Sequence, residues 1–246
     1  MKSFELFADD TVRWVVFGRD PAKPADVIDT NEYLLISDGN GVLMDPGGTE
    51  IFPDVVSAIS DYLPIEKIGA IFGSHQDPDI ISSLSLWLNV CPAARVYVPG
   101  IWTGFITHFG CTASQLIAVP DQGMTLSLST RHSLEFVPAH YLHSSGNHHL
   151  YDPHAKVLFS GDVGAALLPP GSEGLFVEDF DRHIQYMEGF HRRWMPSERA
   201  RDAWIARVSR LDIDYLCPQH GAIFRRADVP RFLDWFGGLA LGSALD

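Results

Sequence analysis

Four short apolar runs in this 246-residue chain each end on histidine or aspartate, and this repeated context most constrains its fold. One run, residues 68–73, leads into SHQDPD, and the others end on PAHYLH, FSGD and PQHG. In α/β folds, polar side chains at the carboxyl ends of strands form functional sites. We therefore predict that these strand ends share one cleft and bring together six side chains: His75, Asp77, Asp79, His143, Asp162 and His220.

The first of these segments has the spacing of a chelating site. His75, Asp77 and Asp79 alternate along SHQDPD, and alternate residues of an extended segment point the same way. Simpler interpretations exist: an Asp-Pro turn here, a turn aspartate at Asp162 and a loop histidine at His220. They do not explain why every one of these residues follows an apolar run, so a metal site is the preferred interpretation.

The motifs SHQDPD, LH at 142–143, FSGD at 159–162 and PQHGAIFR at 218–225 resemble those of the metallo-β-lactamase superfamily. Its metal ligands follow the order H-x-H-x-D-H, then His, Asp and His. Within it, the H-x-D-x-D form of the first motif is most similar to flavodiiron proteins and oxygen-binding diiron proteins. The resemblance covers nearly the whole chain and implies an α/β (α+β) fold, a four-layer αββα sandwich in which residues 1–246 form a single domain.

Two positions depart from the hydrolases of that superfamily. Asp77 replaces their second histidine, and a hard oxygen ligand favours iron or manganese over zinc. Ile80 replaces the histidine that ends the motif, which leaves one metal with fewer ligands and an open position for an exogenous molecule. The resemblance implies two ligand groups bridged by Asp162: His75, Asp77 and His143 for one metal, Asp79 and His220 for the other.

The cofactor that the resemblance implies is a pair of iron ions, joined by a hydroxide or, with O2 bound, a peroxo group. Manganese and zinc are the alternatives. Three carboxylates, two ferrous ions and one hydroxide sum to a neutral cluster, as a buried site requires.

Three functions suit such a site. The first is a protein that binds and senses O2 and reports it to a signalling partner. The second is an O2 or NO reductase, or an oxygenase, that receives electrons from a separate flavoprotein or rubredoxin, since we expect no FMN domain in this chain. The third is a metal-dependent hydrolase of esters, thioesters or lactones.

Charge and cysteine content indicate which partners and which cellular compartment to expect. The 18 Lys and Arg against 31 Asp and Glu give a net charge of −13, which repels nucleic acids and anionic membranes. Cys91, Cys111 and Cys217 lack disulfide or zinc spacing. The amino-terminal residues lack the apolar core of a signal peptide, and no apolar run approaches the ~20 residues of a membrane span. We expect a cytoplasmic protein, and the resemblance implies a homodimer.

The rest of the sequence predicts alternating strands and helices, with a hairpin turn at DGNG, residues 38–41. Helices are expected over residues 50–63, 80–88, 179–211 and 229–241. We expect five further histidines on the surface or behind the ligands, with His140 competing with His143: His140, His148, His149, His183 and His191. Core or helix-face packing is expected of several aromatic residues: Tyr141, Tyr151, Trp87, Trp102, Trp194, Trp204 and Trp235.

Overall fold

Two stacked β-sheets form the centre of the structure, a computed structural model that describes residues 1–18 and 28–245. Among these residues, the first sheet has seven strands in sequence order: β1 (Lys2–Ala8), β2 (Val12–Gly18), β3 (Glu32–Ser37), β4 (Asn40–Met44), β5 (Ile68–Phe72), β6 (Arg95–Pro99) and β7 (Leu116–Val119). In the same described part of the chain, the second sheet has six strands in the order β13-β12-β11-β10-β9-β8: β8 (Thr125–Ser127), β9 (Ser133–Pro138), β10 (His148–Asp152), β11 (Val157–Gly161), β12 (Tyr215–Pro218) and β13 (Phe224–Arg225).

Local connections explain the order of the first sheet. Strands β1 to β4 pair antiparallel with their sequence neighbours, and the DGNG turn pairs Ser37 with Asn40. The hairpin predicted at this turn is confirmed. Strands β4 to β7 run parallel, so their carboxyl ends meet at one edge. Strand β1 was not predicted, because this edge strand is largely exposed and has no buried alternation to reveal it.

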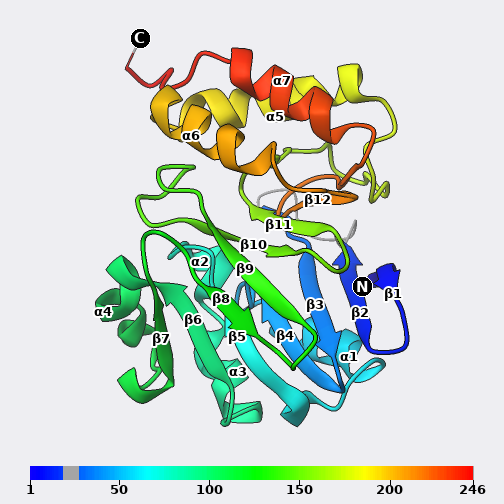
Figure 1. Ribbon diagram of the computed structural model, residues 1–246, viewed down its shortest axis with the longest axis vertical. Helices are drawn as coiled ribbons and strands as arrows, with labels where there is room; N and C mark the ends of the chain where they lie inside the picture. The colour runs from blue at the N-terminus through cyan, green and yellow to red at the C-terminus, as the bar shows by residue number, and fades with distance from the viewer. Residues whose placement is uncertain (19–27, 246) are drawn as a thin grey trace.

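Helices cover the outer face of each sheet, so that the layers run helix, sheet, sheet, helix (Figure 1). This confirms the expected αββα sandwich. One side carries α1 (Phe52–Ser60), α2 (Pro78–Ile81) and α3 (Leu84–Val90), with α4 (Thr103–Ile106) near β6 and β7. The other side carries α5 (Phe180–Trp194), α6 (Glu198–Val208) and α7 (Val229–Gly238).

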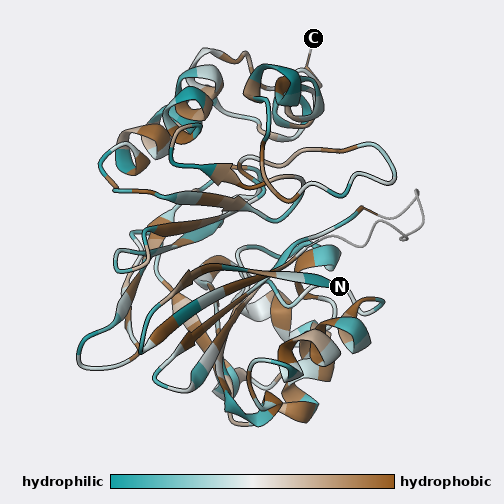
Figure 2. Ribbon diagram, turned by 90° about the vertical axis from the view of Figure 1, so that its right-hand side faces the viewer, coloured by the Kyte–Doolittle hydropathy of each residue, from teal (hydrophilic) through white to brown (hydrophobic). Residues whose placement is uncertain are grey.

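Three apolar clusters fill the spaces between the four layers. The first packs helix residues such as Val55 and Trp87 against the first sheet. The second lies between the sheets and includes Trp14 and Phe159. The third packs α5 to α7 on the second sheet around residues such as Trp204. In Figure 2 the hydrophobic colour accordingly runs along strands of both sheets. Burial of apolar area on both faces of each sheet stabilises the stack.

The helices are shorter than the sequence predicted. Residues 50–63 form a helix only at Phe52–Ser60, and residues 80–88 are divided between α2 and α3. The helical stretch predicted over residues 179–211 is divided into α5 and α6, because the chain leaves helical geometry at Met195 and Ser197 begins α6 by accepting a hydrogen bond from Ala200 N–H. In the described part of the chain, no helix has both the length and the apolar character needed to cross a membrane.

Candidate metal centre

All six predicted side chains lie in one cluster at an edge of the two sheets. SHQDPD follows β5, and His143 lies in the loop between β9 and β10. Asp162 and His220 follow β11 and β12, which are parallel neighbours and therefore end at the same edge. The fold thus brings together residues from distant parts of the chain.

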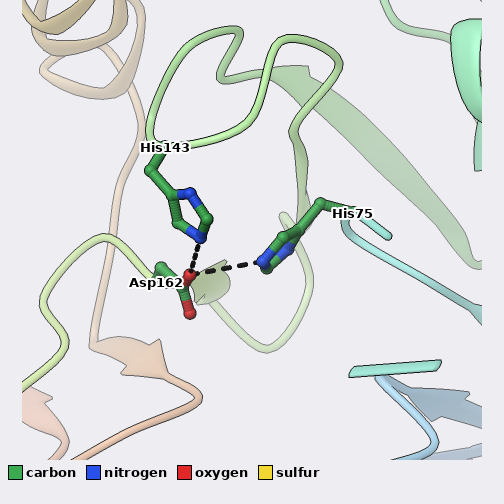
Figure 3. Close-up of side chains that lie close together, drawn as sticks. All are labelled: His75, His143 and Asp162. Carbon is green, nitrogen blue, oxygen red and sulfur yellow. Dashed lines mark ion pairs between the residues drawn. The ribbon is translucent and has the colours of Figure 1, made fainter. Parts of the chain in front are cut away.

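Asp162 lies at the centre of this cluster. Its Oδ2 atom is 2.8 Å from His143 Nε2 and 3.3 Å from His75 Nε2 (Figure 3). Asp77 Oδ2 faces the same two histidines, 3.2 Å from His143 Nε2 and 3.7 Å from His75 Nε2. One ligand atom from each of His75, His143 and Asp162 lies within 4.8 Å of the other two, which suits a single metal ion.

The other oxygen of Asp162 faces a second group. Its Oδ1 atom is 3.3 Å from His220 Nε2, and that nitrogen is 3.4 Å from Asp79 Oδ2. Asp162 therefore turns one oxygen towards His75 and His143 and the other towards His220. The division agrees with the two ligand groups that the resemblance implies, while the role of these residues as metal ligands stays a prediction.

Burial and opposite charge act against each other in the cluster. Burial would lower the pKa of His75, but Asp162 and Asp77 raise it well above its ordinary value. In the same way, Asp162 overcomes burial and raises the pKa of His143 and of His220 to about 9. Burial would raise the pKa of Asp162, but the three histidines hold it well below its usual range. Protons on the imidazoles thus balance the carboxylates, as a bound cation would.

Two of the imidazoles are oriented through their Nδ1 atoms. His220 Nδ1 donates to the carbonyl oxygen of Asp29 at 3.0 Å. His75 Nδ1 lies 2.9 Å from Ser74 Oγ, and that hydroxyl donates to Asp45 Oδ2 at 2.7 Å. If Nδ1 carries the proton in each ring, the lone pair of Nε2 is left for a metal ion.

A residue from the first half of the chain forms hydrogen bonds to the loop that carries His220. Asn31 Nδ2 donates to the carbonyl oxygens of Pro218 at 3.2 Å and Gly221 at 2.9 Å, on either side of His220. Gly221 has a φ of 85°, and a Cβ there would lie 2.6–2.9 Å from atoms of Ala166. Glycine is therefore required for this close approach.

The chemistry of the cluster fits a pair of metal ions. Within the described residues, His75 Nε2 and Asp162 Oδ1 are buried side-chain atoms that have ion-pair contacts at 3.3 Å but no hydrogen bond. Buried polar atoms normally have partners, so these two are suited to an additional ligand. Imidazole and carboxylate donors together bind iron, manganese or zinc.

Ile80 belongs to the apolar core. Its side chain is fully buried in the cluster between the first sheet and its helices. Its carbonyl oxygen accepts a hydrogen bond from Gly47 N–H at 3.0 Å. This position therefore offers no side-chain ligand atom, and the open coordination position expected there stays a prediction.

The other histidines have structural partners. His140 Nε2 lies 2.7 Å from the carbonyl oxygen of Asp121, away from the ligand position that His143 takes. His191 Nε2 accepts from Gly164 N–H at 3.0 Å and so supports the segment just beyond Asp162. Of the two placements expected for these histidines, the surface does not apply to four, which are buried: His148, His149, His183 and His191.

Helix α5 places two aromatic rings against the cluster, which the sequence analysis missed. The Trp194 ring lies 5.4 Å from the His143 ring and stacks on Phe190 at 6.0 Å. Phe190 lies 6.4 Å from His143 and 6.5 Å from His220. Tyr141 is 52% exposed, so core packing is wrong for it, whereas Trp194 is 54% exposed and lies on a helix face, the second of the two placements expected. The i, i+4 spacing of Phe190 and Trp194 indicates a shared helix face, but not what that face covers.

Comparison with known proteins shows that the chain is similar to proteins described as having diiron centres. Residues 28–221 match the family described as ODP family beta lactamase. A structure described as the peroxy diiron species of chemotaxis sensor ODP has 37% sequence identity and a TM-score of 0.89, with 99% of this chain and 97% of that chain covered. The apo state of chemotaxis sensor ODP from T. denticola has 38% identity and a TM-score of 0.90, with 98% and 96% covered.

More distant matches agree in fold. A variant of the flavo di-iron protein from Thermotoga maritima has 21% identity and a TM-score of 0.81, with 96% of this chain and 60% of that chain covered. An uncharacterized protein from Methanocaldococcus jannaschii is 23% identical over 202 residues, which cover 79% of this chain. This chain spans about half (49%) of the length of that curated relative.

Proposed function

Since the chain belongs to the ODP family of β-lactamase-like proteins, we propose that it is a non-haem di-iron protein that binds O2 and acts as an oxygen sensor. The observation that carries this proposal is the shared position of Asp162. Its two oxygens face two separate sets of imidazole and carboxylate groups, as a carboxylate bridging two metal ions must do. The chemotaxis sensor that is similar over almost the whole chain has a peroxy diiron species.

The six residues would form two sets of ligands, one for each iron. His75, Asp77 and His143 would hold one iron, Asp79 and His220 the other, and Asp162 both. Two ferrous ions would supply open coordination positions and electrons for O2 binding. The three carboxylates would offset the charge of the metals, which lowers the cost of burying them.

The aromatic rings of α5 would shield the bound gas. Phe190 lies near ligand histidines of both groups, at 6.4 Å from His143 and 6.5 Å from His220. The Phe190 ring has no polar atom, so it would offer no proton to a bound ligand and would limit the approach of water. Such an environment favours holding O2 over reducing it.

One experiment tests the proposal. The protein is purified without oxygen, its metals are measured, and its optical spectrum is recorded before and after O2 is added. We expect two irons per chain and a long-lived O2-dependent charge-transfer band. One zinc per chain with no such band would contradict the proposal.

The alternative functions give different results in the same assay. Steady consumption of O2 or NO with a reductant and a redox partner would support the reductase or oxygenase. Hydrolysis of esters or thioesters by a zinc-loaded sample would support the hydrolase. A sensor instead requires a protein partner that responds to the oxygenated state, and we propose a signalling protein in that role.

A further inference from the structure

The side chain of Gln76 connects two of the segments that carry candidate metal ligands. Its Nε2 donates to Asp77 Oδ1 at 2.9 Å, and its Oε1 accepts from Ser144 Oγ at 2.6 Å. Ser144 directly follows His143 in the loop between β9 and β10. One amide therefore contacts a ligand from the first half of the chain and the neighbour of a ligand from the second half.

Asp77 determines which end of the Gln76 amide donates and which accepts in these two hydrogen bonds. An ionised carboxylate only accepts hydrogen bonds, so the NH2 group of Gln76 must face it. The amide oxygen is then left to accept the Ser144 hydroxyl. An apolar side chain at position 76 would break both bonds at once.

Gln76 determines which oxygen of Asp77 faces the cluster. With Oδ1 held by the amide, Oδ2 points at His143 Nε2, 3.2 Å away, and at His75 Nε2, 3.7 Å away. The Asp77 side chain is 28% exposed, so packing alone does not fix its rotamer. Without the amide, the carboxylate could turn towards solvent.

Gln76 also contacts the loop that carries His143, in addition to the bond from His148 N–H to the Ser74 carbonyl oxygen at 3.3 Å where that loop enters β10. This loop is not part of a β-strand, and its hydrogen bonds run mainly between its own residues. Tyr141 N–H donates to the Ser144 carbonyl at 2.7 Å, and Asn147 Nδ2 donates to the Leu142 carbonyl at 2.7 Å. The Ser144–Gln76 bond links the residue beside His143 directly to SHQDPD.

We propose that Gln76 is a positioning residue of the metal centre: it turns one oxygen of Asp77 towards the histidines and holds the His143 loop against the same carboxylate. This inference rests on the metal-binding part of the proposed function and does not depend on iron or O2. Loss of a hydrogen bond to a metal ligand typically lowers metal affinity 10–100-fold.

The test is an anaerobic Co(II) titration against a competing chelator, with the visible Co(II) spectrum as a second readout. Gln76→Met keeps the length of the side chain and removes both hydrogen bonds. We expect about 10–100-fold weaker binding of the first Co(II) and a changed spectrum. Ser144→Ala removes only the loop link and should give a smaller loss, because Asp77 keeps its donor. The matched control is Gln185→Met on the exposed face of α5, where the amide donates to the carbonyl oxygen of Arg182, one turn away in the same helix.

The thermal unfolding of each metal-free variant separates positioning from general stability. A positioning role predicts that Gln76→Met melts close to the Gln185→Met control while binding Co(II) more weakly. Wild-type affinity and spectrum in Gln76→Met would overturn the inference, as would a loss of affinity matched by a lower melting temperature. A wild-type protein that binds no Co(II) would instead overturn the metal centre itself, so the two failures are distinguishable.

Discussion

Asp162 is the residue that would join the two halves of the proposed metal centre. Its carboxylate is almost completely buried and faces histidines on both sides, with His143 at 2.8 Å and His220 at 3.3 Å. A buried carboxylate in this position is tolerated only with compensating positive charge. Protonated histidines supply that charge in the metal-free protein, and metal ions would supply it in the loaded one.

We therefore expect Asp162→Ala to lose both metals rather than one. Metal content per chain should fall from two to none in elemental analysis after dialysis, since each group loses its shared oxygen ligand. Asp121→Ala is the control, because Asp121 contacts His140 through its backbone carbonyl and not its side chain. Retention of one metal by Asp162→Ala would rule out the bridging role.

Metal affinity should rise with pH. In the metal-free protein Asp162 overcomes burial and raises the pKa of His143 and His220 to about 9, so both rings are protonated at neutral pH. A metal must displace these protons, and each displaced proton increases the binding constant about tenfold per pH unit below that pKa. Co(II) titrations between pH of about 6 and 9 would measure the slope, and an affinity independent of pH would contradict the assignment.

At the scale of elements, the break between α5 and α6 shapes the second helical layer. Helix α5 ends at Trp194, so that its last turns carry Phe190 and Trp194 over the cluster. Helix α6 then starts in a new direction and places Trp204 beneath β10, where its Nε1 donates to His149 Nδ1 at 3.0 Å. A single helix over this region could not provide both contacts.

Ser197 makes this break stable by capping α6. Its side chain accepts a hydrogen bond from Ala200 N–H at 3.2 Å, which satisfies one of the free donors of the first turn. Ser197→Ala should lower the free energy of unfolding by about 1 kcal/mol in urea denaturation. Ser197→Asp, which keeps an acceptor, should retain most of the stability. Equal losses in the two variants would show that the cap contributes little.

At the scale of the whole molecule, the two sheets are joined at both ends. The candidate metal site lies where β11 ends, whereas Asp152 pairs with Val157 at the start of β11. Here a buried polar network crosses between the sheets: Trp14 Nε1 donates to Asp152 Oδ2 at 2.7 Å, and His132 contacts Asp152 at 3.1 Å and Ser37 Oγ at 2.8 Å. Trp14 and Ser37 belong to the first sheet and Asp152 to the second.

This network should make stability depend on acid pH. Burial would raise the pKa of Asp152, but hydrogen bonds from His132 and Trp14 hold it below the usual 3.8. A depressed pKa stabilises the fold above pH 3.8 and loses that effect as pH falls through the folded-state value. Asp152→Asn should cost about 1–3 kcal/mol near pH 7 and progressively less below pH 3.8. Urea unfolding of the metal-free protein would show this, and a cost that is constant with pH would contradict it.

Several features of the fold and the site could be predicted from local patterns. Apolar runs ending on His or Asp indicated strands whose ends carry a site, and the DGNG turn indicated the β3–β4 hairpin. Helix lengths were less predictable, because apolar spacing continues across Met195 although the chain changes direction there. Strand β1 escaped prediction because an exposed edge strand has little apolar alternation.

The sequence by itself determined which residues gather at the cluster, since donor type and position after an apolar run are local properties. Only the tertiary structure decided that Trp194 lies against His143 and that Gln76 reaches Ser144. These contacts join segments from different sheets and layers. Their distances depend on how the layers pack, and packing is a property of the whole chain that no local pattern records.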